Sequence, residues 1–203
     1  MTNKNSNIDR RISKSKHALK EALLVLMREK DFKKISITDI VQLADLNRGT
    51  FYKHYQYKED ILEEIIDDVI TDLIASYREP YLGSESFDVS KLSPSAIKVF
   101  DHVWKYANFY TLIVQSNALL GFQNRFCNVL KTLALQELSD QMSNPNINRE
   151  LHASYQAYAI LGMIIELVND GFKYSSSYMA EQLLEIIMNS KTNTIVKPNI
   201  VDI

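Results

Sequence analysis

The sequence is poor in residues that break helices and in residues that build disulfide or zinc frameworks. Its 203 residues include only 5 Gly, 4 Pro and 1 Cys. So few Gly and Pro residues argue against an all-β or loop-rich protein. The single cysteine, Cys127, excludes a disulfide framework and a multi-cysteine zinc site within one chain. A reducing, cytoplasmic location is therefore expected.

Patterns that usually mark an enzyme are also absent. The glycines do not have the spacing of a phosphate-binding or dinucleotide-binding loop, and there is no Gly-x-Ser-x-Gly elbow. The histidines, at positions 17, 54, 102 and 152, are too far apart for a His-x-x-x-His metal pair. We therefore expect no catalytic residue, no metal and no cofactor. An enzyme built from residues distant in sequence is the alternative that such a search does not reach.

Long hydrophobic runs are missing as well. The longest, residues 157–165, is too short to span a bilayer. Residues 1–9 are polar and do not have the apolar segment of a signal peptide. From these two features we expect no membrane partner.

Charge is distributed unevenly along the chain. Residues 1–58 contain 13 Lys and Arg against 6 Asp and Glu, a net charge of +7. Residues 59–203 contain 10 against 19, a net charge of −9. A basic end on an acidic body is expected of a DNA-reading domain joined to an effector domain. Chance clustering of charges on a solvated face is the alternative.

Hydrophobic periodicity predicts helices throughout, and no strand-like alternation persists. Four helices are predicted in the first part of the chain: residues 13–30, a short helix opening at Ser36, residues 48–55, and residues 58–77. The last of these is long enough to link two domains. Five more are predicted over residues 94–106, 108–117, 119–143, 147–171 and 176–190. Residues 1–11 are predicted to be a disordered basic arm, and residues 191–203 a loose tail.

The two short helices point to DNA. Ser36 with Asp39 predicts a capped helix start, Asp45 a tight left-handed turn, and Asn47 the cap of the next helix. Two such helices, preceded by a packing helix, form a helix-turn-helix whose second helix enters the major groove. Gly49 would let the backbone approach DNA, or simply reduce crowding. The side chains expected to meet bases or phosphates are Arg48, Thr50, Tyr52, Lys53 and His54.

Residues 36–62 resemble the signature of the TetR family of transcriptional regulators. The resemblance is strong over about residues 12–66 and weaker beyond. There, residues 121–125 and 171–174 loosely resemble a branch that includes an activator of dihydroxyacetone utilisation. Two positions depart from the family: Asp45 replaces a usual Gly, and Tyr57 replaces a frequent Ser. The most specific part is Arg48-Gly49-Thr50-Phe51-Tyr52-Lys53-His54-Tyr55, followed by Lys58-Glu59-Asp60.

This resemblance implies an all-α fold with a three-helix DNA-binding domain over residues 12–56 and a helical regulatory and dimerisation domain over residues 57–190. It implies a homodimer that binds a near-palindromic operator in double-stranded DNA. The default is a repressor released by a small apolar or aromatic effector. An activator, or control by a protein partner, is the alternative. Taken position by position, the motif implies DNA contact for Thr38, Arg48, Thr50, Tyr52, His54 and Lys58.

Candidates in the second domain are less specific. Aromatic residues at helical spacing more often belong to a core than to a pocket. Apolar faces of the last two helices are as consistent with an intramolecular core as with a dimer surface. For the N-terminal domain, a protein-binding three-helix unit is the alternative. The pocket candidates are Trp104, Tyr110, Phe126 and Tyr158, and the dimer candidates are Leu161, Gly162, Ile165, Leu184 and Ile187.

Overall fold

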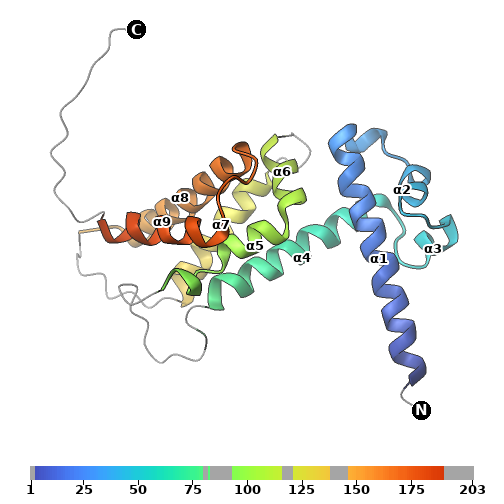
Figure 1. The fold of residues 1–203 in the computed structure, drawn as a ribbon, viewed down its shortest axis with the longest axis horizontal. Coiled ribbons are helices and arrows are strands. Elements are labelled where there is room, and N and C mark those ends of the chain that lie inside the picture. Colours follow the sequence, from blue (N-terminus) through green and yellow to red (C-terminus); the bar gives the residue numbers. More distant parts are fainter. Residues whose placement is uncertain (1–2, 80–81, 83–92, 116–120, 138–145, 190–203) are drawn as a thin grey trace, which may run out of the picture.

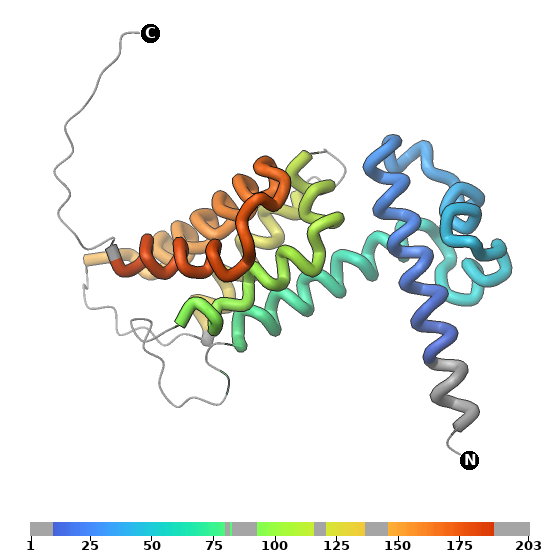
Figure 2. The backbone as a smooth tube through the Cα atoms, viewed as in Figure 1, coloured from blue at the N-terminus to red at the C-terminus, as the bar shows by residue number. Residues whose placement is uncertain are grey.

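A computed structural model describes residues 3–79, 82, 93–115, 121–137 and 146–189 of the chain. Within these ranges the chain contains helices and no strand, which confirms the all-α prediction. Helices α1 to α3 form a group at one end, and α5 to α9 form a bundle at the other (Figure 1). Helix α4 runs between the two groups, as the backbone tube in Figure 2 also shows.

The helices lie close to the predicted ones. The first group comprises α1 (Asn3–Glu29), η1 (Phe32–Lys34), α2 (Ile37–Leu43) and α3 (Arg48–Tyr52), followed by α4 (Lys58–Arg78). The bundle comprises η4 (Pro94–Ala96), α5 (Val99–Lys105), α6 (Ala107–Gln115), α7 (Phe122–Glu137), α8 (Arg149–Asn169) and α9 (Ser176–Asn189).

Two helix starts differ from the prediction. Helix α1 begins at Asn3, so residues 3–11, part of the arm predicted to be disordered, lie in a helix. No Gly or Pro interrupts this stretch, and each residue added to an existing helix gains a hydrogen bond. The helix predicted over residues 94–106 is split, because Ile97 is extended (φ −80°, ψ 100°) between η4 and α5. The predicted tail, residues 191–203, lies outside the described residues.

The local signals around the turn are confirmed. The Ser36 hydroxyl accepts a hydrogen bond from the Asp39 amide at 3.2 Å, and the Asp39 carboxylate accepts one from the Ser36 amide at 2.8 Å. Asp45 adopts the left-handed conformation, with φ 53°. The Asn47 side chain accepts from the Thr50 amide at 2.8 Å. These caps and the turn set the angle between α2 and α3.

One hydrophobic cluster runs from the first group of helices through α4 into the bundle. Phe51 of α3 is fully buried within it, and α4 contributes Ile61, Ile65, Val69 and Leu73. Helix α8 is long and apolar enough to cross a membrane by length and composition alone. Its buried residues belong to the bundle core, which explains why it is so apolar: Ala153, Ala157, Leu161, Ile164, Leu167 and Val168.

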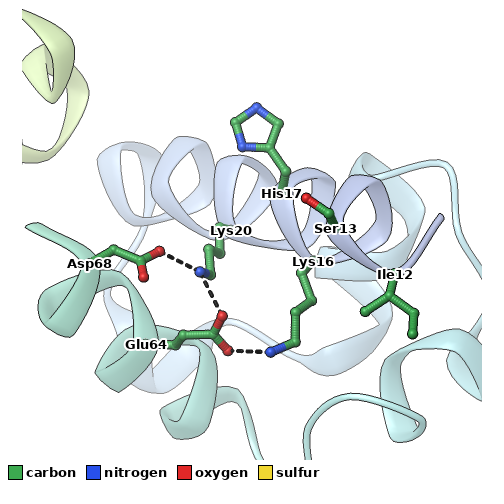
Figure 3. Close-up of a pocket in the computed structure, with 7 residues that line it drawn as sticks. All are labelled: Ile12, Ser13, Lys16, His17, Lys20, Glu64 and Asp68. Atoms are coloured by element: carbon green, nitrogen blue, oxygen red, sulfur yellow. Dashed lines mark hydrogen bonds and ion pairs between the residues drawn. The ribbon is translucent and has the colours of Figure 1, made fainter. Parts of the chain in front are cut away.

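Ion pairs join α1 to the first half of α4 (Figure 3). Lys16 lies 2.9 Å from Glu64, and Lys20 bridges Glu64 at 2.8 Å and Asp68 at 2.5 Å. Partial burial alone would raise the pKa of Glu64, but the ammonium groups of Lys20 and Lys16 lower it to about 2. Glu64 is therefore charged at neutral pH and ties the two helices together.

A buried histidine joins the second half of α4 to the bundle. His102 of α5 places Nδ1 2.7 Å from an Asp72 carboxylate oxygen and Nε2 2.9 Å from the Tyr110 hydroxyl. Lys105 also donates to Asp72. Burial lowers the pKa of His102, although the Asp72 carboxylate opposes this effect. A neutral imidazole that donates to Asp72 and accepts from Tyr110 satisfies all three groups, so α4, α5 and α6 are held together.

This arrangement predicts a specific loss of stability in acid. Because the pKa of His102 is lower in the folded than in the unfolded chain, the unfolded chain binds the extra proton first as pH falls below about 6.5. The free energy of unfolding of the wild type should therefore fall between about pH 6.5 and the folded pKa of His102. Urea unfolding at a series of pH values measures this slope.

His102→Gln, which does not titrate, should have a shallower slope in that window. His17→Gln, which changes an exposed histidine of α1, should keep the wild-type slope. Identical slopes for wild type and His102→Gln would contradict the assignment.

Candidate nucleic-acid interface

The short helix α3 presents a polar and basic surface. Arg48, Gly49 and Lys53 are exposed, and the Tyr52 side chain is 57% exposed. Thr50 and His54 are half-buried at the edge of this surface. Phe51 and Tyr55 pack into the core, so one face anchors this segment and the other faces solvent. The structure thus brings six of the eight predicted DNA-contact residues onto one short segment.

Two of these side chains are held by neighbours. The Arg48 guanidinium donates a hydrogen bond to the Thr38 hydroxyl of α2. The Thr50 hydroxyl lies 3.2 Å from Asn47 Oδ1, the atom that also caps the α3 amide. A Cβ atom added at Gly49 would meet Asn47 Oδ1 at 3.2 Å. The absence of a side chain at Gly49 therefore gives room to the Asn47 cap.

Lys58 is held inside the domain. Its ammonium donates to the carbonyl oxygens of Phe32 at 2.7 Å, Ile35 at 2.8 Å and Lys33 at 3.4 Å. It also lies 4.6 Å from the centre of the Phe32 ring. An ammonium has three donors, and each has a carbonyl acceptor here. In this conformation Lys58 joins η1 to the start of α4, and none of its donors is left for a phosphate.

The start of α4 keeps one half of a capping box. Tyr57 gives no side-chain cap, but the Asp60 carboxylate accepts from the backbone amides of Gln56 and Tyr57, each at 2.8 Å. The Asp60 amide, which a serine at position 57 would cap, donates to the Tyr57 carbonyl oxygen at 3.3 Å. The Tyr57 side chain is 57% exposed.

The ion pairs between α1 and α4 were not predicted. Lys16 and Lys20 are four residues apart on one helix, as are Glu64 and Asp68 on the other. Residues at this spacing share a helix face. Two lysines at this spacing on one predicted helix and two carboxylates at the same spacing on another could therefore have predicted these ion pairs. No such spacing signals the Arg48–Thr38 contact, because that contact depends on how α2 crosses α3.

The four predicted pocket residues do not form one site. Tyr110 and Phe126 are buried core residues with ring centres 6.2 Å apart. Trp104 is 40% exposed and packs on Phe172, with ring centres 5.1 Å apart. Tyr158 is 56% exposed on α8. Trp104 and Tyr158 thus lie at the surface, whereas Tyr110 and Phe126 lie together in the core: the periodicity located apolar positions but not the face of the bundle on which each one lies.

The predicted dimer residues also divide. Leu161 and Leu184 are buried within the subunit, which agrees with the alternative of an intramolecular core. Ile165 is half-buried, whereas Gly162 and Ile187 are exposed. Exposed residues on one face of α8 are Leu151, Tyr155, Tyr158 and Gly162, and the exposed apolar residues of α9 include Ile186 and Ile187.

Comparison with known proteins agrees with this geometry. Residues 19–65 match the family model of bacterial regulatory proteins of the tetR family, and residues 90–189 match a model of a transcriptional regulator C-terminal region. The chain is 24% identical over 185 residues to YxbF, an uncharacterised HTH-type transcriptional regulator of Bacillus subtilis. The match covers 91% of this chain but 47% of YxbF, so the chain spans about half the length of that relative.

Solved structures share the fold. A TetR-family transcriptional regulator from Syntrophomonas wolfei superposes with a TM-score of 0.64 at 20% identity, over 91% of this chain and 99% of that one. A TetR transcriptional regulator from Streptococcus agalactiae gives 0.57 at 20% identity, over 90% and 98%. DhaS, a dihydroxyacetone kinase operon activator, gives 0.59 at 20% identity, over 87% and 95%. Identities this low show a common fold alone.

The contacts of Lys58 predict a structural effect. Lys58→Met removes the ammonium, so the carbonyl oxygens of Phe32, Lys33 and Ile35 lose this hydrogen-bond donor. The free energy of unfolding should fall by about 1.5–3 kcal/mol, the usual range for hydrogen bonds to a charged group. Urea unfolding provides the measurement. Lys53→Met removes an exposed lysine of the same domain and should leave the unfolding midpoint unchanged. A wild-type midpoint for Lys58→Met would rule out the structural role.

Proposed function

Because the chain belongs to the TetR family of bacterial transcriptional regulators, we propose that it binds a specific operator through α3 as a homodimer. Regulators of this family are DNA-binding transcription factors, and the chain is not an enzyme. The observation that carries the proposal is the exposed, basic face of α3, anchored from behind by buried Phe51. A cytoplasmic location is part of the same proposal, because the operator is there.

Within this interface the residues divide by chemistry. Arg48 is suited to a guanine edge, and Thr50 to a thymine methyl or a phosphate. Tyr52, Lys53 and His54 are donors for phosphates, which fix the position of the protein without reading sequence. For Lys58 we propose a supporting role in place of direct DNA contact, because its ammonium is bound to three carbonyls.

The dimer is proposed to form through the exposed apolar face of α8 and α9. Tyr155 is 68% exposed and Tyr158 56%, and Ile186 on α9 is 55% exposed. Gly162 lies on the same face and permits close approach of a partner helix. A two-fold axis here would place two α3 helices on successive major grooves, roughly 34–36 Å apart, on a near-palindromic operator.

A small effector is proposed to act through α4. An open cavity of about 540 Å³ lies between α4 and α7. Its lining combines apolar Ile74, Val129 and Leu133 with polar Asn124, Arg125, Asn128 and Thr132. A ligand that binds one position of α4 more tightly than another would shift the population between these positions. The distance between the two DNA-binding domains of the dimer would then change. DNA-binding domains whose separation no longer matches the spacing of the major grooves would dissociate from the operator. We therefore propose that ligand binding relieves repression. Activation, or control by a protein partner, is the alternative.

Operator binding is tested first with fragments of genomic DNA selected by the purified protein. Arg48→Ala should weaken binding to the selected operator by about tenfold or more and relax the base preference, since a bidentate arginine contributes about 1–3 kcal/mol of discrimination. Lys173→Ala removes one positive charge from the segment between α8 and α9, outside the DNA-binding domain, and should bind as wild type. Wild-type affinity of Arg48→Ala in a gel-shift titration would refute the role of α3.

The dimer surface is tested by placing charge on it. Tyr155→Glu combined with Tyr158→Glu should give a monomer in analytical ultracentrifugation, because two carboxylates would be buried unpaired at the interface. Operator affinity should fall by at least about tenfold, because the two DNA-binding domains are no longer linked and cannot bind the operator together. Leu43→Glu, at an exposed apolar residue of α2, should remain a dimer. A dimeric Tyr155→Glu, Tyr158→Glu protein would place the interface elsewhere.

A further inference from the structure

The contact between Thr38 and Arg48 links the two helices of the DNA-binding motif. Arg48 is the first residue of α3, and Thr38 is the second residue of α2. The Arg48 Nη2 atom donates to the Thr38 hydroxyl oxygen across this crossing. Arg48 is exposed and Thr38 is half-buried. A long side chain on the reading surface is therefore held from one side by a short side chain on the supporting helix.

Thr38 is itself held firmly. It lies inside the capping box formed by Ser36 and Asp39, so its backbone is fixed at the first turn of α2. The Asp39 carboxylate also lies 2.9 Å from the Lys30 ammonium, just past the end of α1. Hydrogen bonds from Ser36 and Lys30 lower the pKa of Asp39 to about 2, so the pair is charged at neutral pH. The hydroxyl that meets Arg48 thus has a defined position relative to all three helices.

The partner of Arg48 is neutral, which preserves its charge for DNA. In the part of the chain that the structure describes, no carboxylate forms an ion pair with Arg48. A hydroxyl oxygen engages one of the five N–H donors of a guanidinium. A carboxylate at the same place would neutralise the charge and occupy the fork that recognises guanine. Thr38 restrains the side chain and leaves donors for a base.

We propose that Thr38 is a positioning residue for base readout, which holds the Arg48 guanidinium in the orientation that reads one base pair. The inference rests on the proposed binding of an operator by α3. Its physical basis is preorganisation: a side chain that already occupies one rotamer loses less conformational entropy when it binds. Because the restraint selects one orientation, it should act on base preference more than on overall affinity.

The test separates this role from direct contact of Thr38 with a phosphate. A phosphate contact strengthens binding to every sequence alike, whereas an oriented arginine strengthens binding to one base over the others. The operator is first defined by selection from randomised DNA with the wild-type protein. Binding constants are then measured for the operator and for its single-base variants at the position where Arg48→Ala loses discrimination.

Thr38→Val keeps the shape of threonine and removes the acceptor. It should reduce discrimination at that position by about three- to tenfold, the range for one ordinary hydrogen bond in a protein, because the site is solvated. Thr38→Ser keeps the hydroxyl and should stay within about twofold of wild type. Thr38→Ala is a second variant with the same expected loss. In the Arg48→Ala background, Thr38→Val should have no further effect on base preference.

Three results would overturn the inference. A uniform loss across all sequences would assign Thr38 to a phosphate, and unchanged discrimination would show that the contact has no role in readout. A loss in Thr38→Val that persists at full size in the Arg48→Ala background would show that it does not act through Arg48. Failure of the wild type to select any sequence would instead refute operator binding itself, which distinguishes the two proposals. Unfolding midpoints of all variants verify that they fold.

Discussion

Helix α4 must belong to two groups of helices at once, and its acidic side chains are the means by which each group holds it. Glu64 and Asp68 face the lysines of α1, while Asp72 faces His102 and Lys105 of α5. Asp67 lies 3.1 Å from Arg125 of α7. Cations from both ends of the molecule therefore contact one helix. A displacement of α4 by the bundle would change its ion pairs with α1, and so the position of the DNA-binding domain.

The charges set geometry more than they supply stability. An exposed ion pair contributes about 0–1 kcal/mol, because solvent screens it and two long side chains lose freedom. A fully buried aliphatic side chain contributes about 1.5–3 kcal/mol, and α4 buries Ile61, Ile65, Val69, Ile70 and Leu73. The apolar face thus keeps α4 in place, and the charged pairs fix its rotation and its register along α1. Arg28 of α1 adds a direct link to the bundle through Asn108, at 2.9 Å.

The exposed face of α3 likewise depends on contacts made by its buried side with the rest of the domain. Helix α3 has only five residues, too few to be stable alone. Its cap, Asn47, precedes the helix, its own Phe51 packs into the shared core, and its Arg48 contacts Thr38 of α2. Those supports leave Arg48, Tyr52 and Lys53 exposed on a helix that does not have to fold when it meets DNA. Preorganisation of this kind lowers the entropic cost of binding.

The sequence by itself determined the helices, the capped turn and the basic reading face. These features are local: a cap, a left-handed turn or an apolar stripe is specified by residues within a few positions of one another. Ser36, Asn47 and Phe51 could therefore be placed correctly without a structure. The start of α1 was missed because a polar helix carries no apolar stripe to reveal it.

Only the tertiary structure decided which side chains meet across helices. It sent Tyr110, Phe126, Leu161 and Leu184 into the core, and it turned the Lys58 ammonium toward the backbone of η1. Periodicity shows that a position is apolar, but burial depends on the rotation of each helix against its neighbours, which many distant contacts set together. For the same reason the Thr38–Arg48 contact and the His102 network follow from the packing of the helices and could not be derived from sequence spacing.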